Sequence, residues 1–299
     1  MSVRYLIPQL LLLFVAVHAA AQISPDGPNV EQVATGYRFT EGPAEAPDGA
    51  IYFTDTPNNQ IHRFDPSTGE SATFREDAGR ANGLMFDAQG RLVACEGAAP
   101  GGRRRVSRTE PDGSLTTLAG MWEGKPLNSP NDLDIDATGG IYFTDPRYGN
   151  RDDMELDVEA VYYLAPDGTL TRVIDDLVRP NGLILSADEK VLYVADNSAR
   201  KLVAYDVSTP GKPENPRPFS PMGPGHGGGC DGMSIDAQGR VYATGDEGVY
   251  IFNPDGTQAA LIPTPERPAN CTLARDGKTL YITARTSLYR VVLDQPTTD

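Results

Sequence analysis

Six copies of one short pattern recur along the 299-residue chain, and their spacing constrains its fold more than any other feature. In each copy an oxygen-bearing residue stands seven or eight positions before a tight turn, and a strand-like run such as IYFTD or VLYVAD follows. These residues are Glu41, Asn82, Asn131, Asn181, Asp231 and Asn270. Successive copies lie 39 to 50 residues apart. A period of that length, with strands in every copy, is typical of a β-propeller blade.

The six oxygen-bearing residues, called ring residues below, recur at the same phase of each copy. If each one begins the innermost strand of its blade, all six side chains point into one central channel. Pro-Asp-Gly and similar turns, about 25 residues after each ring residue, separate further runs of alternating polarity. No segment of 12 or more residues has the apolar period of a helix. The sequence therefore predicts an all-β fold, a six-bladed β-propeller with very low helix content.

Two terminal segments predict how the ring closes. Residues 28–39 precede the first ring residue, and residues 287–293 have the pattern of the third strand of the last blade. We expect the N-terminal strand to complete that blade, because closure removes an exposed sheet edge. Two long segments, 148–157 and 210–229, are expected to form loops at the channel mouth.

The first 21 residues have the features of a secretory signal peptide. Arg4 precedes an apolar run over residues 6–17, and Ala19-Ala20-Ala21 offers a small-residue cleavage site. We expect residues 22–299 to form a single domain that is periplasmic or secreted and free of the membrane after cleavage. An uncleaved signal anchor is the alternative.

Charge and cysteine content narrow the function further. The formal net charge is −15, whereas a nucleic-acid-binding protein needs a basic face. No G-x-S-x-G motif is present, which argues against a serine hydrolase of that type.

Of the three cysteines, Cys95 lies within a strand and is expected to be buried. A disulfide between Cys230 and Cys271 stays open, because Cα separation decides it.

The ring residues offer oxygen ligands. Two are carboxylates, Glu41 and Asp231, and the other four are carboxamides. Such a set suits a hard divalent cation, and Ca²⁺ fits its flexible coordination better than Mg²⁺, whereas zinc prefers His or Cys. The alternative is that the Asn-Gly and Asp-Gly pairs only shape turns, an interpretation that suits Asn82 and Asn270 best.

Four further motifs connect the chain to a known family. They read N-S-P-N-D-L from residue 128, R-P-N-G-L from 179, C-D-G-M-S-I-D from 230 and E-R-P-A-N-C-T-L from 266. Together they resemble the gluconolactonase / senescence-marker-protein (regucalcin) / luciferin-regenerating-enzyme family over essentially the whole mature chain. The resemblance implies a six-bladed propeller with one divalent cation in the channel, commonly Ca²⁺, with Zn²⁺, Mn²⁺ or Mg²⁺ as alternatives. It also implies hydrolysis of a sugar lactone.

Carried over position by position, the resemblance implies roles for four residues. Glu41, Asn181 and Asp231 would be the metal ligands, Asn131 would bind substrate, and Asp231 would also accept the proton in catalysis. One position departs from the family pattern: Ser129 stands where some sugar lactonases carry a substrate-binding Arg. The identity of the lactone therefore stays open.

The resulting expectation is a metal-dependent lactonase, a hydrolase that opens a gluconolactone-like cyclic ester and acts as a monomer or weak dimer. The alternative is a non-enzymatic calcium-binding propeller that binds a sugar or a protein partner at the channel rim.

Overall fold

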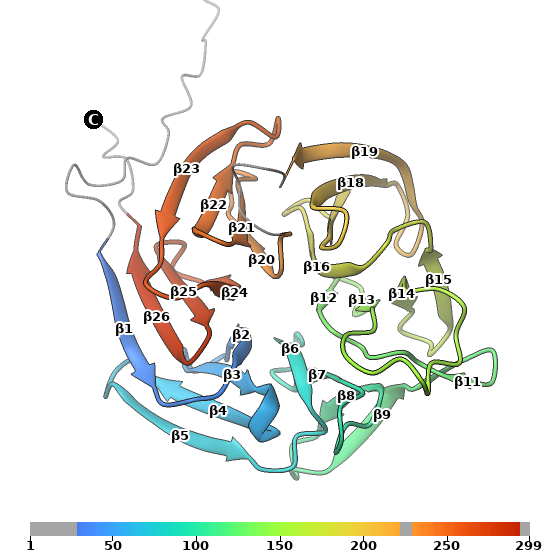
Figure 1. Ribbon diagram of the computed structural model, residues 1–299, viewed down its shortest axis with the longest axis horizontal. Coiled ribbons are helices and arrows are strands. Elements are labelled where there is room, and N and C mark those ends of the chain that lie inside the picture. Colours follow the sequence, from blue (N-terminus) through green and yellow to red (C-terminus); the bar gives the residue numbers. More distant parts are fainter. Residues whose placement is uncertain (1–28, 222–228, 294–299) are drawn as a thin grey trace, which may run out of the picture.

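The computed structural model describes residues 29–221 and 229–293, and these form six four-stranded antiparallel sheets. Figure 1 shows the sheets arranged as a ring around a common axis. The predicted all-β, six-bladed propeller is confirmed. The predicted signal peptide, residues 1–21, lies outside the described residues.

Each blade is built from consecutive strands, with the innermost strand first in the chain. Blade 1 is β2 (Thr40–Glu45), β3 (Ile51–Asp55), β4 (Gln60–Asp65) and β5 (Glu70–Arg75). Blade 2 is β6 (Ala81–Phe86), β7 (Leu92–Glu96), β8 (Arg105–Thr109) and β9 (Leu115–Ala119). Blade 3 is β12 (Leu133–Ile135), β13 (Ile141–Asp145), β14 (Ala160–Leu164) and β15 (Leu170–Ile174).

The second half of the ring repeats this order. Blade 4 is β16 (Pro180–Leu185), β17 (Val191–Asp196), β18 (Lys201–Val207) and β19 (Pro213–Pro221). Blade 5 is β20 (Met233–Ile235), β21 (Val241–Gly245), β22 (Gly248–Phe252) and β23 (Gln258–Pro263). Blade 6 is β24 (Pro268–Leu273), β25 (Thr279–Ala284) and β26 (Ser287–Val292), with β1 (Val30–Thr35) as its outer strand.

The N-terminal strand closes the ring, as predicted. Strand β1 pairs antiparallel with β26, and Gln32 Nε2 donates a 2.8 Å hydrogen bond to Ser287 Oγ. Figure 1 shows β1 beside β26 at the outer edge of blade 6. This pairing covers the edge that β26 would otherwise expose.

The apolar core is divided among the blade interfaces. Six clusters of buried side chains appear in the described residues, one between each pair of neighbouring blades. The cluster that joins blade 6 to blade 1 contains Phe53, Phe64, Tyr281 and Leu288, each no more than 4% exposed. Burial on this scale, distributed around the whole ring, holds the inner strands at fixed distances from the axis.

One predicted loop is partly wrong. Residues 213–221 of the expected 210–229 loop form β19, the outermost strand of blade 4. Prolines are tolerated there because an edge strand needs hydrogen bonds on one side only. Residues 222–228 of that segment lie outside the described residues.

Elements outside the blades are few. A short hairpin, β10 (Met121–Trp122) and β11 (Lys125–Pro126), follows blade 2, and a single-turn 3₁₀ helix, η1 (Thr56–Asn58), follows β3. The expectation of very low helix content is confirmed for the described part of the chain. Among those residues no helix has the length and apolarity needed to cross a membrane. All three cysteines are buried and unpaired.

Candidate functional site

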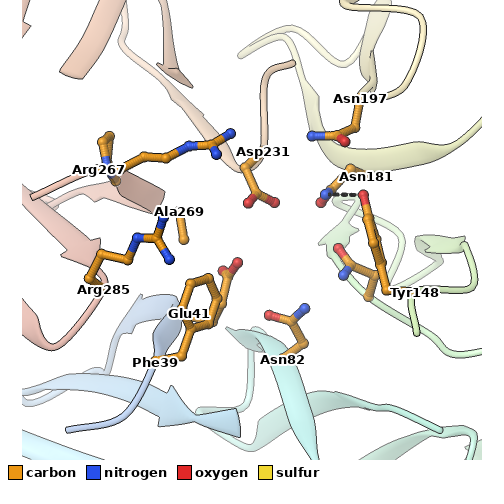
Figure 2. Close-up of a pocket in the computed structure, with 12 residues that line it drawn as sticks. Phe39, Glu41, Asn82, Tyr148, Asn181, Asn197, Asp231, Arg267, Ala269 and Arg285 are labelled. Carbon is orange, nitrogen blue, oxygen red and sulfur yellow. Dashed lines mark hydrogen bonds between the residues drawn. The ribbon is translucent and has the colours of Figure 1, made fainter. Parts of the chain in front are cut away.

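A cavity of about 420 Å³ opens at the amino-terminal ends of the innermost strands. Figure 2 shows polar side chains from several blades converging on it. Five of the six ring residues line the cavity: Glu41, Asn82, Asn131, Asn181 and Asp231. The other lining residues are Phe39, Tyr148, Asn197, Arg267, Pro268, Ala269 and Arg285.

Breaks in strand pairing aim the ring side chains inward. In blades 1, 2 and 4 the pairing of the first two strands is interrupted at the ring residue, between Glu41 and Ala44, between Ala81 and Leu84, and between Pro180 and Leu183. An irregularity of this kind bends a strand and redirects a side chain. The ring residues therefore face the channel instead of alternating across a flat sheet.

Hydrogen bonds between neighbouring blades fix the ring backbone. The glycine after one ring position donates to the carbonyl of the next: Gly83 to Asn131 at 2.7 Å, Gly182 to Asp231 at 3.0 Å, and Gly232 to Ala269 at 2.7 Å. At residue 182 a Cβ would collide with the carbonyl oxygen of Asp231. The glycines of the Asn-Gly and Asp-Gly pairs thus permit close approach of adjacent inner strands, and they do not form hairpin turns.

A buried aspartate anchors the segment before the ring residue in three blades. Each carboxylate accepts two backbone N–H hydrogen bonds of 2.6 to 3.2 Å: Asp55 from Arg38 and Phe39, Asp145 from Asn128 and Ser129, and Asp196 from Val178 and Arg179. All three aspartates are 0% exposed. Because a buried carboxylate needs hydrogen-bond donors, these bonds set the backbone two and three residues before Glu41, Asn131 and Asn181.

The two ring carboxylates lie in an unfavourable electrostatic environment. Burial and the nearby charge of Asp231 hold the pKa of Glu41 well above its ordinary value, and one Glu41 oxygen accepts a 3.0 Å hydrogen bond from Gly42 N. Burial raises the pKa of Asp231 to about 6, and a hydrogen bond from Asn181 and the positive charge of Arg267 oppose this shift. Two carboxylates enclosed in one cavity repel each other unless a cation or a proton compensates them.

The amide of Asn181 adds another oxygen to this pair. Its Nδ2 donates a 2.7 Å hydrogen bond to Tyr148 Oη, and a hydrogen bond from the same side chain lowers the pKa of the neighbouring Asp231. Asn181 therefore lies beside Asp231 in the cavity, where its Oδ1 is an oxygen that a cation can use. In the described residues no group of three or more His, Cys, Asp or Glu side chains could hold a metal. The candidate ligand set instead combines two carboxylates with an amide, and its all-oxygen chemistry fits a hard divalent ion.

The sixth predicted ring residue is misplaced by one position. Ala269 lines the cavity, and its carbonyl accepts the hydrogen bond that marks a ring position. Asn270 lies further along β24, where its Oδ1 accepts from Cys271 N at 2.8 Å. It lines a second cavity, of about 250 Å³, beside Asp132. Asn270 still points into the central channel, as predicted: its Nδ2 lies 3.4 Å from Asp132 Oδ2 of blade 3, and its side chain hydrogen-bonds Glu41. It stands one position beyond the phase of the other ring residues, because the last copy of the pattern is one residue shorter, so Ala269 takes its place in the first cavity.

Two side chains of blade 3 have different roles. Asn131 is 8% exposed and lines the cavity. Ser129, the position that departs from the family pattern, accepts a 3.0 Å hydrogen bond from Ala98 N. It lines an adjoining cavity of about 310 Å³, to which Asn131 and Tyr148 also contribute.

Four polar residues of the site were not predicted individually. Tyr148 comes from the predicted 148–157 rim loop, and Asn197 from the turn between β17 and β18. Arg267 directly precedes β24, and Arg285 lies in the turn between β25 and β26. These residues belong to connections between strands, where the repeat carries no common pattern.

Comparisons with known proteins give consistent results. A family profile described as SMP-30/Gluconolactonase/LRE-like region matches residues 39–286. A gluconolactonase of Zymomonas mobilis is 33% identical over 291 residues, and the match covers 88% of this chain and 80% of that protein.

Solved structures agree with these sequence matches. The structure of a gluconolactonase from Xanthomonas campestris superposes with a TM-score of 0.84 at 32% identity, covering 91% of each chain. A regucalcin from Agrobacterium tumefaciens, named a calcium-binding protein, superposes with a TM-score of 0.75 at 18% identity, covering 88% of this chain and 93% of that one. The last comparison supports the fold alone.

Proposed function

Since the chain belongs to the SMP-30/gluconolactonase/LRE family, we propose that it is a metal-dependent lactonase that hydrolyses a gluconolactone-like sugar lactone. Its lactonase homologues are hydrolases of cyclic esters. The family also includes calcium-binding members, the regucalcins. The observation that carries the proposal is the convergence of Glu41, Asp231 and Asn181 on one cavity, where among the described residues no cationic side chain forms an ion pair with either carboxylate.

Glu41, Asn181 and Asp231 would hold the cation, most suitably Ca²⁺, with Mn²⁺, Zn²⁺ and Mg²⁺ as alternatives. When bound, the ion would polarise the lactone carbonyl and stabilise the negative charge that develops on its oxygen. Asn131, on the same cavity wall, would hydrogen-bond the substrate and orient its ring.

Asp231 would serve as the proton acceptor. A water held beside its carboxylate attacks the carbonyl carbon, the ring C–O bond breaks, and the proton taken by Asp231 passes to the alkoxide that leaves. A carboxylate that also ligates a metal is a weaker base, because the positive charge lowers its pKa. Burial acts in the opposite direction and raises it. Variants that separate ligation from proton transfer therefore test this double role.

The proposal includes export. Residues 1–21 would direct the chain to the periplasm or the medium, where the mature protein from about residue 22 would act as a monomer or weak dimer. N-terminal sequencing of protein recovered from the periplasmic fraction or from the medium tests this assignment. A start near residue 22 supports it, and an intact Met1 contradicts it.

Purified protein treated with a chelator should lose hydrolysis of δ-gluconolactone and regain it when Ca²⁺ or another divalent ion is added. Activity that survives complete metal removal would overturn the metal-dependent mechanism. Stoichiometric Ca²⁺ binding without hydrolysis of any sugar lactone would favour the alternative, a non-enzymatic calcium-binding propeller with a ligand at its rim.

A further inference from the structure

Two arginines form one wall of the cavity, and neither has a role in the lactone hydrolysis proposed above. Arg267 and Arg285 both come from blade 6, and Figure 2 shows both guanidinium groups pointing into the cavity, across from Tyr148 and Asn197. The chain as a whole carries a net charge of −15. The two arginines thus place positive charge at the cavity of a protein whose net charge is negative.

The turn that carries Arg285 is hydrogen-bonded to neighbouring segments. Arg285 has a φ of 45°, in the left-handed region that side chains other than Gly, Asn and Asp rarely adopt. Its carbonyl accepts a 2.8 Å hydrogen bond from Thr40 N in blade 1. The next residue, Thr286, donates its N–H to Glu266 at 2.7 Å. These two hydrogen bonds hold the turn, and with it Arg285, at the edge of the cavity.

The guanidinium group of Arg285 has no charged or hydrogen-bonding partner among the described residues, whereas Arg267 Nε forms a 2.7 Å ion pair with Asp246. Arg179, which lies over Tyr148, forms an ion pair with Glu159 at 3.2 Å and is 5.0 Å from the centre of the Tyr148 ring. Arg285 is thus available to a ligand, and Arg267 is held beside it by Asp246.

The metal of the proposed function would strengthen the attraction of the two arginines for an anionic ligand. A divalent cation would neutralise the charges of Glu41 and Asp231, so the two arginines would then dominate the field in the cavity. Guanidinium groups bind carboxylates and phosphates through paired, charge-assisted hydrogen bonds. The cavity, at about 420 Å³, has the size of sites that enclose small ligands whole.

We propose that Arg285 and Arg267 bind an anionic group on the substrate, so that the preferred lactone is a sugar-acid lactone with a second acidic group away from the reacting carbonyl. The inference rests on the proposed lactonase function and specifies its substrate class. The acidic group is a carboxylate, as in the lactone of a dicarboxylic sugar acid, or a phosphate ester.

The test compares kcat/KM for three lactones: neutral δ-gluconolactone, glucaro-1,4-lactone with its free carboxylate, and 6-phosphogluconolactone. The wild-type protein should prefer one of the two anionic substrates over the neutral one, and the preferred one identifies the acidic group. In Arg285→Gln the ratio of kcat/KM for that anionic lactone to kcat/KM for δ-gluconolactone should fall about 10- to 100-fold, the range expected when hydrogen bonds to a charged group are lost. In Arg217→Gln, an exposed arginine on the outer strand β19, the ratio should stay at the wild-type value.

Binding measurements distinguish failure of this inference from failure of the proposed function. Calorimetry should show that the wild-type protein binds glucarate or 6-phosphogluconate more tightly than gluconate, and that Arg285→Gln removes this difference. If no lactone is hydrolysed but the binding difference and its loss are observed, the arginine site stands and the lactonase proposal falls. If lactones are hydrolysed without preference for charge, or if Arg285→Gln leaves the ratio unchanged, the arginine site is overturned.

Discussion

Asn181 Nδ2 donates a 2.7 Å hydrogen bond to Tyr148 Oη, and the same side chain hydrogen-bonds the carboxylate of Asp231. The phenol thus helps to fix the position of the amide beside Asp231. It comes from a loop of blade 3 and acts on a residue of blade 4, so the arrangement depends on the packing of neighbouring blades. Its consequence for metal binding can be measured directly.

Tyr148→Phe should weaken Ca²⁺ binding by about 2- to 10-fold, since a net hydrogen bond contributes about 0.5–1.5 kcal/mol. The phenyl ring would still pack under Arg179, so only the hydroxyl is lost. Isothermal titration with Ca²⁺ measures the change. The matched control is Tyr205→Phe, because the buried Tyr205 hydroxyl has no partner among the described residues. Equal affinities in the two variants would contradict the orienting role of Tyr148.

Glu41→Gln should weaken Ca²⁺ binding on the order of tenfold or more, because it removes one of the two formal negative charges of the ligand set. Elemental analysis and calorimetry of the purified variant give its stoichiometry and affinity. Glu70→Gln, on the exposed outer strand of the same blade, is the control and should bind as the wild type does. Unchanged binding in Glu41→Gln would remove Glu41 from the ligand set.

Calcium affinity should fall as the pH is lowered through about 6. Burial raises the pKa of Asp231 to about 6, and the pKa of Glu41 lies well above its ordinary value, so protons compete with the metal in this range. Binding to the protonated site must release protons, which lowers the affinity as the pH falls. Titrations from pH 5 to pH 8 in buffers of different ionisation enthalpy count those protons. An affinity that does not change between pH 5 and pH 7 would show that both carboxylates are already ionised without metal.

The architecture of the channel was predictable from the sequence, because each copy of the repeat corresponds to one blade. The period of the ring residues, with a strand after each turn, indicates blade number and identifies Glu41, Asn181 and Asp231 as neighbours in space. The phase was predictable only where the pattern is complete. In blade 6 the pattern is one residue shorter, so Asn270 points into the channel one position further along its strand, and Ala269 occupies the ring position.

The rim of the site was not predictable in the same way. Tyr148, Arg267 and Arg285 lie in connections whose lengths and sequences differ from blade to blade. Their positions depend on contacts such as the hydrogen bond from Thr40 N to the carbonyl of Arg285, which joins residues from opposite ends of the chain. No local pattern encodes a contact of that kind.

Asp145→Ala should lower the free energy of unfolding by about 2 kcal/mol, because it leaves two backbone donors, the buried Asn128 N and the part-buried Ser129 N, without their acceptor. Urea unfolding of metal-loaded protein measures the loss. The control is Asp112→Ala, which removes an acceptor for Ser114 N in an exposed turn and should cost less than about 1 kcal/mol. Equal losses in the two variants would show that the buried aspartate does not anchor the segment before Asn131.

Asp231→Asn separates metal ligation from proton transfer. Asparagine keeps an oxygen ligand of similar size but cannot accept the proton, so the variant should retain part of the Ca²⁺ binding while lactone hydrolysis falls by roughly 10²-fold or more. Saturating metal should not restore its activity, whereas it should partly restore that of Glu41→Gln, whose defect is one of affinity. Rates at increasing Ca²⁺ concentration, measured in parallel for the two variants, make the comparison. If Asp231→Asn reaches a near wild-type rate at saturating metal, Asp231 is a ligand only, and the attacking water loses its proton without a protein base.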